Sequence, residues 1–407
     1  MTGTPEIFTG SFTRQEPIPE DAIDAAIAVM RSGRLHRYNV AADEIGEVAA
    51  LEQEFAAYTG AKYALAVASG GYALGAALRA VGVEPGDRVL TNAFTLAPVP
   101  GAIAGVGAVP VFVGVTGALT IDLDDLAAKA GQARVLMLSH MRGHLANMDR
   151  LMQICDAAGI TVIEDCAHTM GAAWRGRKSG RDGRIGCYSV QSYKHLNAGE
   201  GGLLITDDDE VMARAILLSG SYMLYGRHGT VPPDAAFEHA KYDVPNISGR
   251  MDNLRAAILR PQLARLDAQC AAWTERYRTV EAGLRGTAGV TVIERPDEES
   301  FVGSSIQFLL MDWPDAAVTE VVARCARRGV QLKWFGGTEP EGYTSRYDSW
   351  RYVPAAPLPA TDRVLRATLD MRLPLTFTLE DCALIARIIR AEVGAVWQAG
   401  AADVTPA

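Results

Sequence analysis

The sequence VIEDCAHTMGAAWRGRKSGRDGRIGCYSVQSYKHLNAGEGG, residues 162–202, decides the fold of this chain. It continues a β-branched apolar run, residues 161–163, which ends on the acids Glu164 and Asp165. Such a run is typical of a buried parallel strand at its carboxyl end. Further on, Lys194 lies between a serine-bearing turn and a cluster of glycines. Because open α/β sheets bind ligands at the carboxyl ends of their strands, we expect Asp165 and Lys194 to share one site.

An acid and a lysine at one site suit pyridoxal 5'-phosphate as a cofactor. Its aldehyde needs an amine with which to form a Schiff base, and its pyridine nitrogen needs a carboxylate that keeps it protonated. Lys194 can supply the amine and Asp165 the carboxylate. Taken singly, Lys194 also fits a solvated surface residue, and Asp165 a turn or a helix cap. Their order in the chain and the glycines around them favour the cofactor.

Three motifs of this stretch together resemble the DegT/DnrJ/StrS family of aminotransferases that act on sugars and cyclitols. They are EDCAH at 164–168, YSxxxxK at 188–194 and GEGG at 199–202. The resemblance implies the α/β fold of type I pyridoxal-phosphate transferases, with a large domain built on a mostly parallel sheet and a smaller C-terminal α/β domain. We place the large domain, with an N-terminal arm, at residues 1–260, and the small domain, with a linking helix, at residues 261–407.

The resemblance also implies roles for single residues. In the family's pattern Lys194 is the Schiff-base lysine, Asp165 is the partner of the pyridine nitrogen, and Ser189 is a ligand of the cofactor phosphate. His168 stands where the family usually has a glutamine that touches the ring hydroxyl, and an imidazole can donate a hydrogen bond there as well.

A second part of the phosphate site is expected upstream. An apolar strand at 63–67 is followed by Ser69, Gly70 and Gly71 and then by a helix at 73–81. A helix N-terminus after a turn of small residues offers free backbone N–H groups and the positive end of the helix dipole. The family has Ser-Gly-Thr here and binds the cofactor phosphate with it, so Gly71 removes one hydroxyl ligand. The alternative is an ordinary strand-to-helix turn.

Two further assignments stay open. In the family an aromatic side chain stacks on the pyridine ring; the matching position is Leu96, and Phe94 could serve instead. The family also has an asparagine that reaches the phosphate of the partner subunit in a homodimer. Ser248 holds that position, and Asn246 lies two residues before it. The alternative for Asn246 is a cap on the helix that follows.

Three other stretches are interpreted as structural. Residues 171–179 come close to a phosphate-binding loop but lack a lysine directly after the second glycine, so we expect a surface hairpin. His140 and His144 have the spacing of metal ligands on a helix, but the glycine between them predicts a loop and argues against a metal. Residues 254–283 are expected to form a long helix that links the domains, with a kink at Pro261.

Composition limits the partners and the location. The chain of 407 residues is long enough for two domains. Its net charge of −9 argues against a nucleic-acid partner. The six cysteines lack paired or metal-binding spacing, which is typical of the cytoplasm. The N-terminus shows no apolar signal region. The uncharged stretch 89–121 is interrupted by prolines and glycines, so we expect strand, helix and strand and not a membrane span.

The function we expect is that of an aminotransferase that depends on pyridoxal phosphate. It would move an amino group from glutamate or glutamine to a keto-sugar or keto-cyclitol, in the biosynthesis of amino sugars or secondary metabolites such as antibiotics. One alternative is a dehydratase of the same fold; these usually have a histidine in place of the lysine, so Lys194 argues against it. The other is a non-catalytic regulatory protein that binds the cofactor, for which Gly71 and Leu96 leave room.

Overall fold

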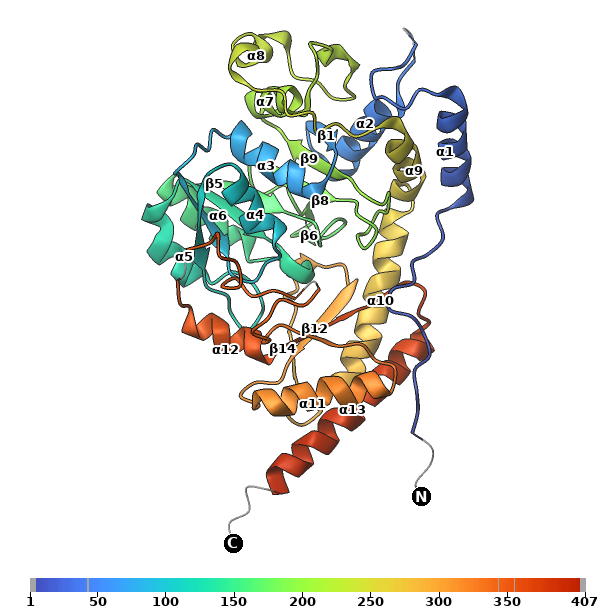
Figure 1. The fold of residues 1–407 in the computed structure, drawn as a ribbon, viewed down its shortest axis with the longest axis vertical. Helices are drawn as coiled ribbons and strands as arrows, with labels where there is room; N and C mark the ends of the chain where they lie inside the picture. The colour runs from blue at the N-terminus through green and yellow to red at the C-terminus, as the bar shows by residue number, and fades with distance from the viewer. Residues whose placement is uncertain (1–4, 42–43, 343, 355, 403–407) are drawn as a thin grey trace.

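The computed structural model describes residues 5–402 apart from residues 42–43, 343 and 355. A seven-stranded sheet, the central sheet, lies in the upper part of Figure 1. In spatial order its strands are β1 (Tyr63–Val67), β9 (Gly202–Thr206), β8 (Ile185–Ser189), β5 (Thr161–Asp165), β4 (Val135–Ser139), β2 (Arg88–Asn92) and β3 (Val109–Val113). Strands β8, β5, β4, β2 and β3 run parallel, and β9 is antiparallel to both neighbours. The predicted α/β fold with a mostly parallel sheet is confirmed.

Helices cover both faces of the central sheet, because buried parallel strands are apolar on both sides. Along β5, Val162 joins the core on one face and Ile163 the core on the other. The helices on the Val162 face are α2 (Glu47–Thr59), α5 (Leu123–Lys129), α6 (Met148–Ala158) and α9 (Asn253–Leu263). Those on the Ile163 face are α3 (Gly70–Ala80), α4 (Pro98–Gly105), α7 (Asp209–Ser219) and α8 (Ala240–Asp243). Helix α1 (Glu20–Ser32) packs on α9.

Local sequence explains how these elements start and stop. Helix α3 begins after Ser69, whose hydroxyl accepts the backbone N–H of Tyr72 at 3.0 Å, as an N-cap does. Helix α6 ends at Gly159, whose φ of 67° is the left-handed conformation that glycine adopts without strain. The uncharged stretch 89–121 folds as predicted, into β2, α4 and β3. Among the described residues, no helix combines the length and the apolar character that crossing a bilayer requires.

A second sheet, the C-terminal sheet, lies in the lower part of Figure 1. In spatial order its antiparallel strands are β10 (Thr291–Val292), β12 (Ser305–Leu309), β14 (Thr368–Arg372) and β13 (Lys333–Trp334). The helices around it are α10 (Leu266–Leu284), α11 (Asp315–Arg327), α12 (Pro359–Ala367) and α13 (Leu379–Ala402). Phe8 and Phe12 also pack into the core of this sheet, so the N-terminal residues join the C-terminal part of the chain. The boundary at residues 260 and 261 stays a prediction.

The predicted hairpin is present, whereas the predicted linking helix is divided into two helices. Strands β6 (Ala173–Trp174) and β7 (Arg177–Lys178) form the expected hairpin, and β11 (Glu299–Ser300) pairs with β6. The single helix with a kink at Pro261 was wrong, because α9 ends at Leu263 and α10 begins at Leu266. Pro261 lies inside α9, and its carbonyl accepts the Arg265 side chain instead of a backbone N–H. The chain therefore breaks one turn beyond the proline.

Candidate active site

Asp165 and Lys194 lie at the same edge of the central sheet. Asp165 is the last residue of β5, and Lys194 follows β8, the strand that pairs with β5 in parallel. Both side chains are partly buried, and the charge of each acts on the pKa of the other. The structure thus brings together the two residues that the sequence motif singled out.

The amine of Lys194 has a pKa well below that of an ordinary lysine. Burial lowers its pKa to about 8, since a buried ammonium ion loses its hydration. The charges of Arg142 and Arg372 lower this pKa as well, while Asp165 raises it. An unprotonated lysine is the form that attacks an aldehyde or accepts a proton, so this environment suits a reactive amine.

His168 contacts Lys194 directly. Its Nε2 atom lies 2.8 Å from Lys194 Nζ, and its Nδ1 atom accepts the backbone N–H of Arg142 at 3.2 Å. Because Nδ1 accepts, the proton of a neutral imidazole must sit on Nε2, from where it points at the lone pair of Lys194 when that amine is unprotonated. Burial holds the pKa of His168 well below its usual value, and the charge of Lys194 lowers it further. His168 therefore presents a hydrogen-bond donor at the reacting amine.

Asp165 is a carboxylate with spare capacity to accept hydrogen bonds. It accepts the Ser139 hydroxyl at 3.3 Å and the Ala167 backbone N–H at 3.1 Å. Burial raises its pKa, while the Ala167 N–H and the charge of Lys194 lower it. A carboxylate with such free acceptor positions is stabilised by a further N–H donor that carries positive charge. A protonated pyridine nitrogen is such a donor.

Ser69, Gly70 and Ser189 meet at the N-terminus of α3. A Cβ atom added to Gly70 would lie 2.9 Å from the Cβ of Ser189, so glycine is required for this approach. Added to Gly71, it would lie 3.9 Å from the Ser69 hydroxyl oxygen, its nearest neighbour, so a small group has room there. Helix N–H groups and a serine hydroxyl together bind phosphate groups well. With Asp165 and Lys194, these residues fit pyridoxal phosphate.

The two residues considered for the ring face follow β2 at the carboxyl edge of the central sheet. Phe94 has an exposed fraction of 1% and packs edge to face on Phe335, with 5.0 Å between ring centroids. Leu96 is partly buried against the same apolar cluster, which joins the central and C-terminal sheets. The choice between Phe94 and Leu96 stays a prediction.

Asn246 and Ser248 lie on an exposed turn. The side-chain oxygen of Asn246 accepts the backbone N–H of Ser248 at 3.0 Å. The cap on α9 is Asp252, which accepts the N–H of Arg255 at 2.9 Å. The alternative in which Asn246 caps the following helix was therefore wrong, because Asp252 is adjacent to the helix and Asn246 is not.

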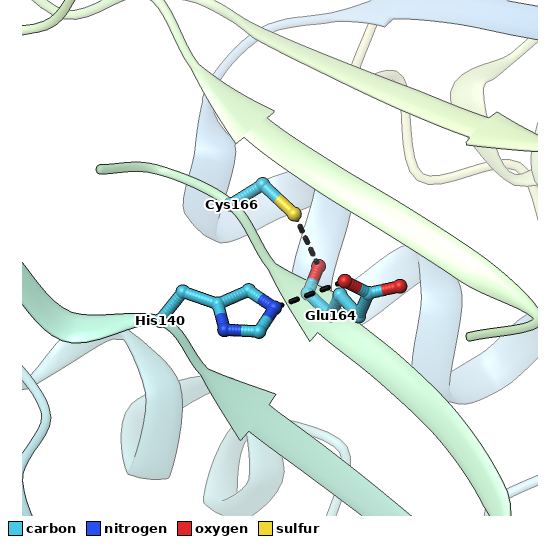
Figure 2. A group of neighbouring side chains, drawn as sticks. All are labelled: His140, Glu164 and Cys166. Carbon is cyan, nitrogen blue, oxygen red and sulfur yellow. Dashed lines mark hydrogen bonds and ion pairs between the residues drawn. The ribbon is translucent and has the colours of Figure 1, made fainter. Parts of the chain in front are cut away.

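His140, Glu164 and Cys166 form a buried group at the end of β5 (Figure 2). The Glu164 carboxylate accepts His140 Nε2 at 2.9 Å and three backbone N–H groups, those of Gly180, Asp182 and Gly183. Burial raises the pKa of the Cys166 thiol well above its usual value, so it stays protonated, whereas metal binding needs a thiolate. His144 bonds elsewhere, to Gln307 at 2.7 Å. We assign the group a structural role: it fixes the end of β5.

Four charged residues near Lys194 were missed by sequence reasoning. Arg142 lies in the turn after β4, where its φ of 56° is left-handed, and it forms an ion pair with Asp370 at 3.0 Å. Lys333 and Arg372 come from the C-terminal sheet. Arg142 lies in the loop predicted between His140 and His144, but that pattern did not point to the site. The other three, Lys333, Asp370 and Arg372, depend on pairing between distant strands.

The fold and this set of residues define a protein of the type I pyridoxal-phosphate transferase class. The chain belongs to the DegT/DnrJ/EryC1/StrS aminotransferase family, whose model matches residues 18–390.

Similar proteins fall in the same class. The chain is 36% identical over 249 residues to 3-amino-5-hydroxybenzoate synthase of Amycolatopsis mediterranei, covering 60% of this chain and 61% of that protein. It is 35% identical over 223 residues to L-glutamine:scyllo-inosose aminotransferase of Streptomyces griseus, covering 53% and 51%. The chain thus spans little more than half the length of these relatives. The crystal structure of 3-amino-5-hydroxybenzoic acid synthase superposes with a TM-score of 0.81 at 27% identity, over 95% of this chain and 99% of that one.

Proposed function

We propose that the chain is an aminotransferase that depends on pyridoxal phosphate and moves an amino group from glutamine or glutamate to a keto-sugar or keto-cyclitol. The observation that carries the proposal is the Lys194 amine at the sheet edge near Asp165: its pKa is lowered to about 8, and its Nζ atom lies 2.8 Å from His168 Nε2. The names of the similar proteins supply the substrate class: one acts on an inosose with glutamine as donor, and another makes an aminobenzoate.

Each residue has one task in this proposal. When bound, the cofactor withdraws electrons from the Cα of a substrate amine and makes its proton removable. Lys194 would hold the aldehyde carbon, and once a substrate amine has displaced it, its neutral amine would take the proton from the substrate Cα and deliver it to that carbon. Asp165 would keep the pyridine nitrogen protonated, and His168 would donate to the ring hydroxyl. Ser69, Gly70 and Ser189 bind the phosphate, with Gly71 beside them.

The assembly belongs to the proposal as well. We infer a homodimer in the cytoplasm in which Asn246 or Ser248 of one subunit approaches the phosphate held by the other. Both residues are exposed on the single chain, as residues at such an interface would be.

The test begins with the covalent link to Lys194. The purified protein should absorb visible light, and borohydride should bleach the band and leave the cofactor on Lys194 in peptide mapping. Lys194→Ala should abolish the band. Lys178→Ala is the matched control, because Lys178 lies in the same stretch, on the hairpin, but contacts Tyr58 of α2 and Asp267 of α10. An adduct on another lysine would overturn the assignment.

Single-turnover reactions then separate the aminotransferase from its alternatives. Mixing with L-glutamine or L-glutamate should convert the bound cofactor to pyridoxamine phosphate within one turnover. A regulatory protein would bind the cofactor without this conversion. A dehydratase would act on a hydroxylated substrate without consuming an amino donor.

A further inference from the structure

The turn after β4 packs its backbone against His168. Residues Met141–Gly143 form this turn, and the backbone N–H of Arg142 donates to His168 Nδ1 at 3.2 Å. A Cβ atom added to Gly143 would lie 3.3 Å from the His168 carbonyl oxygen, so the turn also contacts the backbone of His168. The other ring nitrogen, Nε2, lies 2.8 Å from Lys194 Nζ. The turn therefore helps to orient a side chain that contacts the reacting amine.

The backbone of this turn is strained at Arg142. Its φ of 56° and ψ of 22° lie in the left-handed region, which is unfavourable for a residue with a Cβ atom. A residue keeps such a conformation where the surrounding structure holds it in place. The side chain of Arg142 shows which part of the structure does so.

That side chain is held by the C-terminal sheet. The guanidinium of Arg142 forms an ion pair with Asp370 of β14 at 3.0 Å, and the two side chains have exposed fractions of only 11% and 1%. The guanidinium also lies 5.8 Å from the ring centre of Phe335, the residue after β13. Because a buried contact between charged groups is shielded from water, it restrains its partners more firmly than an exposed one.

Asp370 is fixed in turn by the neighbouring strand. Gln307 lies directly opposite it on β12 and donates to its carboxylate at 2.7 Å. The side-chain oxygen of Gln307 lies 2.7 Å from His144 Nε2, so the amide is held at both ends. Buried polar groups that all have partners make a structure rigid. Contacts thus run from the C-terminal sheet through the turn after β4 to His168.

We propose that Asp370 and Arg142 are positioning residues for His168. The inference rests on the proposed function and deepens it, because His168 is there the donor to the ring hydroxyl of the cofactor. In a neutral imidazole one nitrogen donates and the other accepts. The ion pair holds the Arg142 N–H on Nδ1, which keeps the proton on Nε2 and fixes the direction in which the ring donates.

The first experiment observes this contact in the full-length protein without cofactor. Two-bond correlation spectra of protein with 15N-labelled histidine report which ring nitrogen carries the proton and whether the other accepts a hydrogen bond. The chain has seven histidines, and the signal lost in His168→Gln belongs to His168. In the wild type Nε2 should carry the proton and Nδ1 should accept. In Asp370→Asn Nδ1 should take the shift of a free nitrogen, and hydrogen exchange of the Arg142 amide should accelerate about tenfold, as the loss of one hydrogen bond implies.

Two variants of Arg142 test the role of its backbone. Both remove the guanidinium, but glycine adopts a φ of 56° without strain and alanine does not. Arg142→Gly should therefore keep the Nδ1 hydrogen bond in a larger fraction of molecules than Arg142→Ala, and the reverse order would overturn the proposal. Arg142→Ala also replaces Asp370→Asn as the test if the latter does not fold.

The controls make the same chemical change elsewhere. Asp312 forms an exposed ion pair with Arg363, so Asp312→Asn should leave the His168 signals in place. His228, whose Nδ1 lies 2.9 Å from the Arg37 guanidinium outside this network, should give the same signals in every variant. Thermal unfolding checks that each variant is folded. The proposal is overturned if wild-type His168 carries its proton on Nδ1, or if its signals stay unchanged in folded Asp370→Asn.

The second experiment asks whether the positioning reaches the cofactor. Calorimetry compares the affinity of the apoprotein for pyridoxal phosphate with that for an analogue without the ring hydroxyl. The ratio of the two affinities should fall about tenfold from the wild type to Asp370→Asn, as expected for one hydrogen bond to the ring oxygen. A purely structural role would weaken both ligands alike and leave the ratio unchanged, which would overturn the proposal. If the His168 signals and this ratio respond but no amino donor reacts with the wild type, the positioning stands and the proposed function fails.

Discussion

Two groups of side chains meet at Lys194, and they differ in how the chain supplies them. The first group, the motif wall, consists of Asp165, His168, Ser189 and Lys194. All four come from one stretch of the chain, at the ends of β5 and β8 or just after them. The second group, the strand wall, consists of Gln307, Lys333, Asp370 and Arg372, from three strands that are distant in the sequence. The motif wall combines an acid, an amine and a hydroxyl, whereas the strand wall combines an amide, an acid and two basic groups.

The two walls act on the reaction in different ways. The motif wall fits the constant part of the reaction, because any amino acceptor needs the same amine and the same carboxylate at the cofactor. The strand wall acts through charge, since Arg372 lowers the pKa of Lys194 and Lys333 lowers that of His168. Variants in the two walls should therefore fail in different ways.

The largest effect should come from Asp165 in the motif wall. Asp165→Asn keeps the shape of the side chain but loses the charge that holds a proton on the pyridine nitrogen. The rate of the half-reaction with glutamine should fall by about 100-fold or more, the equivalent of a strong charge-assisted hydrogen bond. Stopped-flow absorbance measures this rate. Near-normal turnover in folded Asp165→Asn would remove the pyridine-nitrogen role, whereas Asp156→Asn, at the far end of α6, should have no effect.

The pH dependence of cofactor capture should show the next largest effect. Burial disfavours the ammonium form of Lys194 and brings its pKa to about 8. Since the neutral amine attacks the aldehyde, capture by the apoprotein should rise about tenfold per pH unit below pH 8 and level off above it. A lysine with the ordinary pKa of about 10.4 would still show a steep rise at pH 9. Rapid mixing with pyridoxal phosphate, followed by borohydride trapping, gives the profile; a rise that continues to pH 10 would contradict it.

The motif wall was predictable from the sequence, and the strand wall was not. Asp165 ends an apolar run that has the length of a strand, and Ser189 and Lys194 stand at fixed spacing, so residue types and order were sufficient. Lys333 lies in a strand of two residues, too short for any periodic pattern, and meets Asp370 only through pairing with β14. The end of α9 was also missed, because the side chain of Arg265, the residue before α10, satisfies the Pro261 carbonyl.

In the inferred homodimer, a second copy of the chain would supply further residues to this site. Asn246 is exposed and does not cap α9, so its role in a neighbouring site is untested within one chain. If it acts across a dimer, inactive Lys194→Ala and Asn246→Ala subunits complement each other, because a mixed dimer holds one intact site. Refolding equal amounts together should restore about a quarter of the wild-type activity, as random pairing and one intact site per mixed dimer imply.

Each variant refolded alone is the control for this complementation. Size-exclusion chromatography must show dimers in every sample. If mixed dimers form and no activity returns, Asn246 does not contribute to the partner's site, and the two walls of one chain are then the better description of the site.

The smallest expected effect is a shift in the pKa of Lys194, on which both walls act. The motif wall raises this pKa through Asp165, and the strand wall lowers it through Arg372. The break in the capture profile should therefore move to lower pH in Asp165→Asn and to higher pH in Arg372→Gln, each by less than about one unit for a single partly solvated charge. Arg366→Gln should leave the break in place. Arg366, on α12, belongs to neither wall and forms an exposed ion pair with Asp315 of α11. Opposite signs would establish that both walls act on one amine, and shifts of equal sign would mean that the changes act through the packing of the site and not through charge.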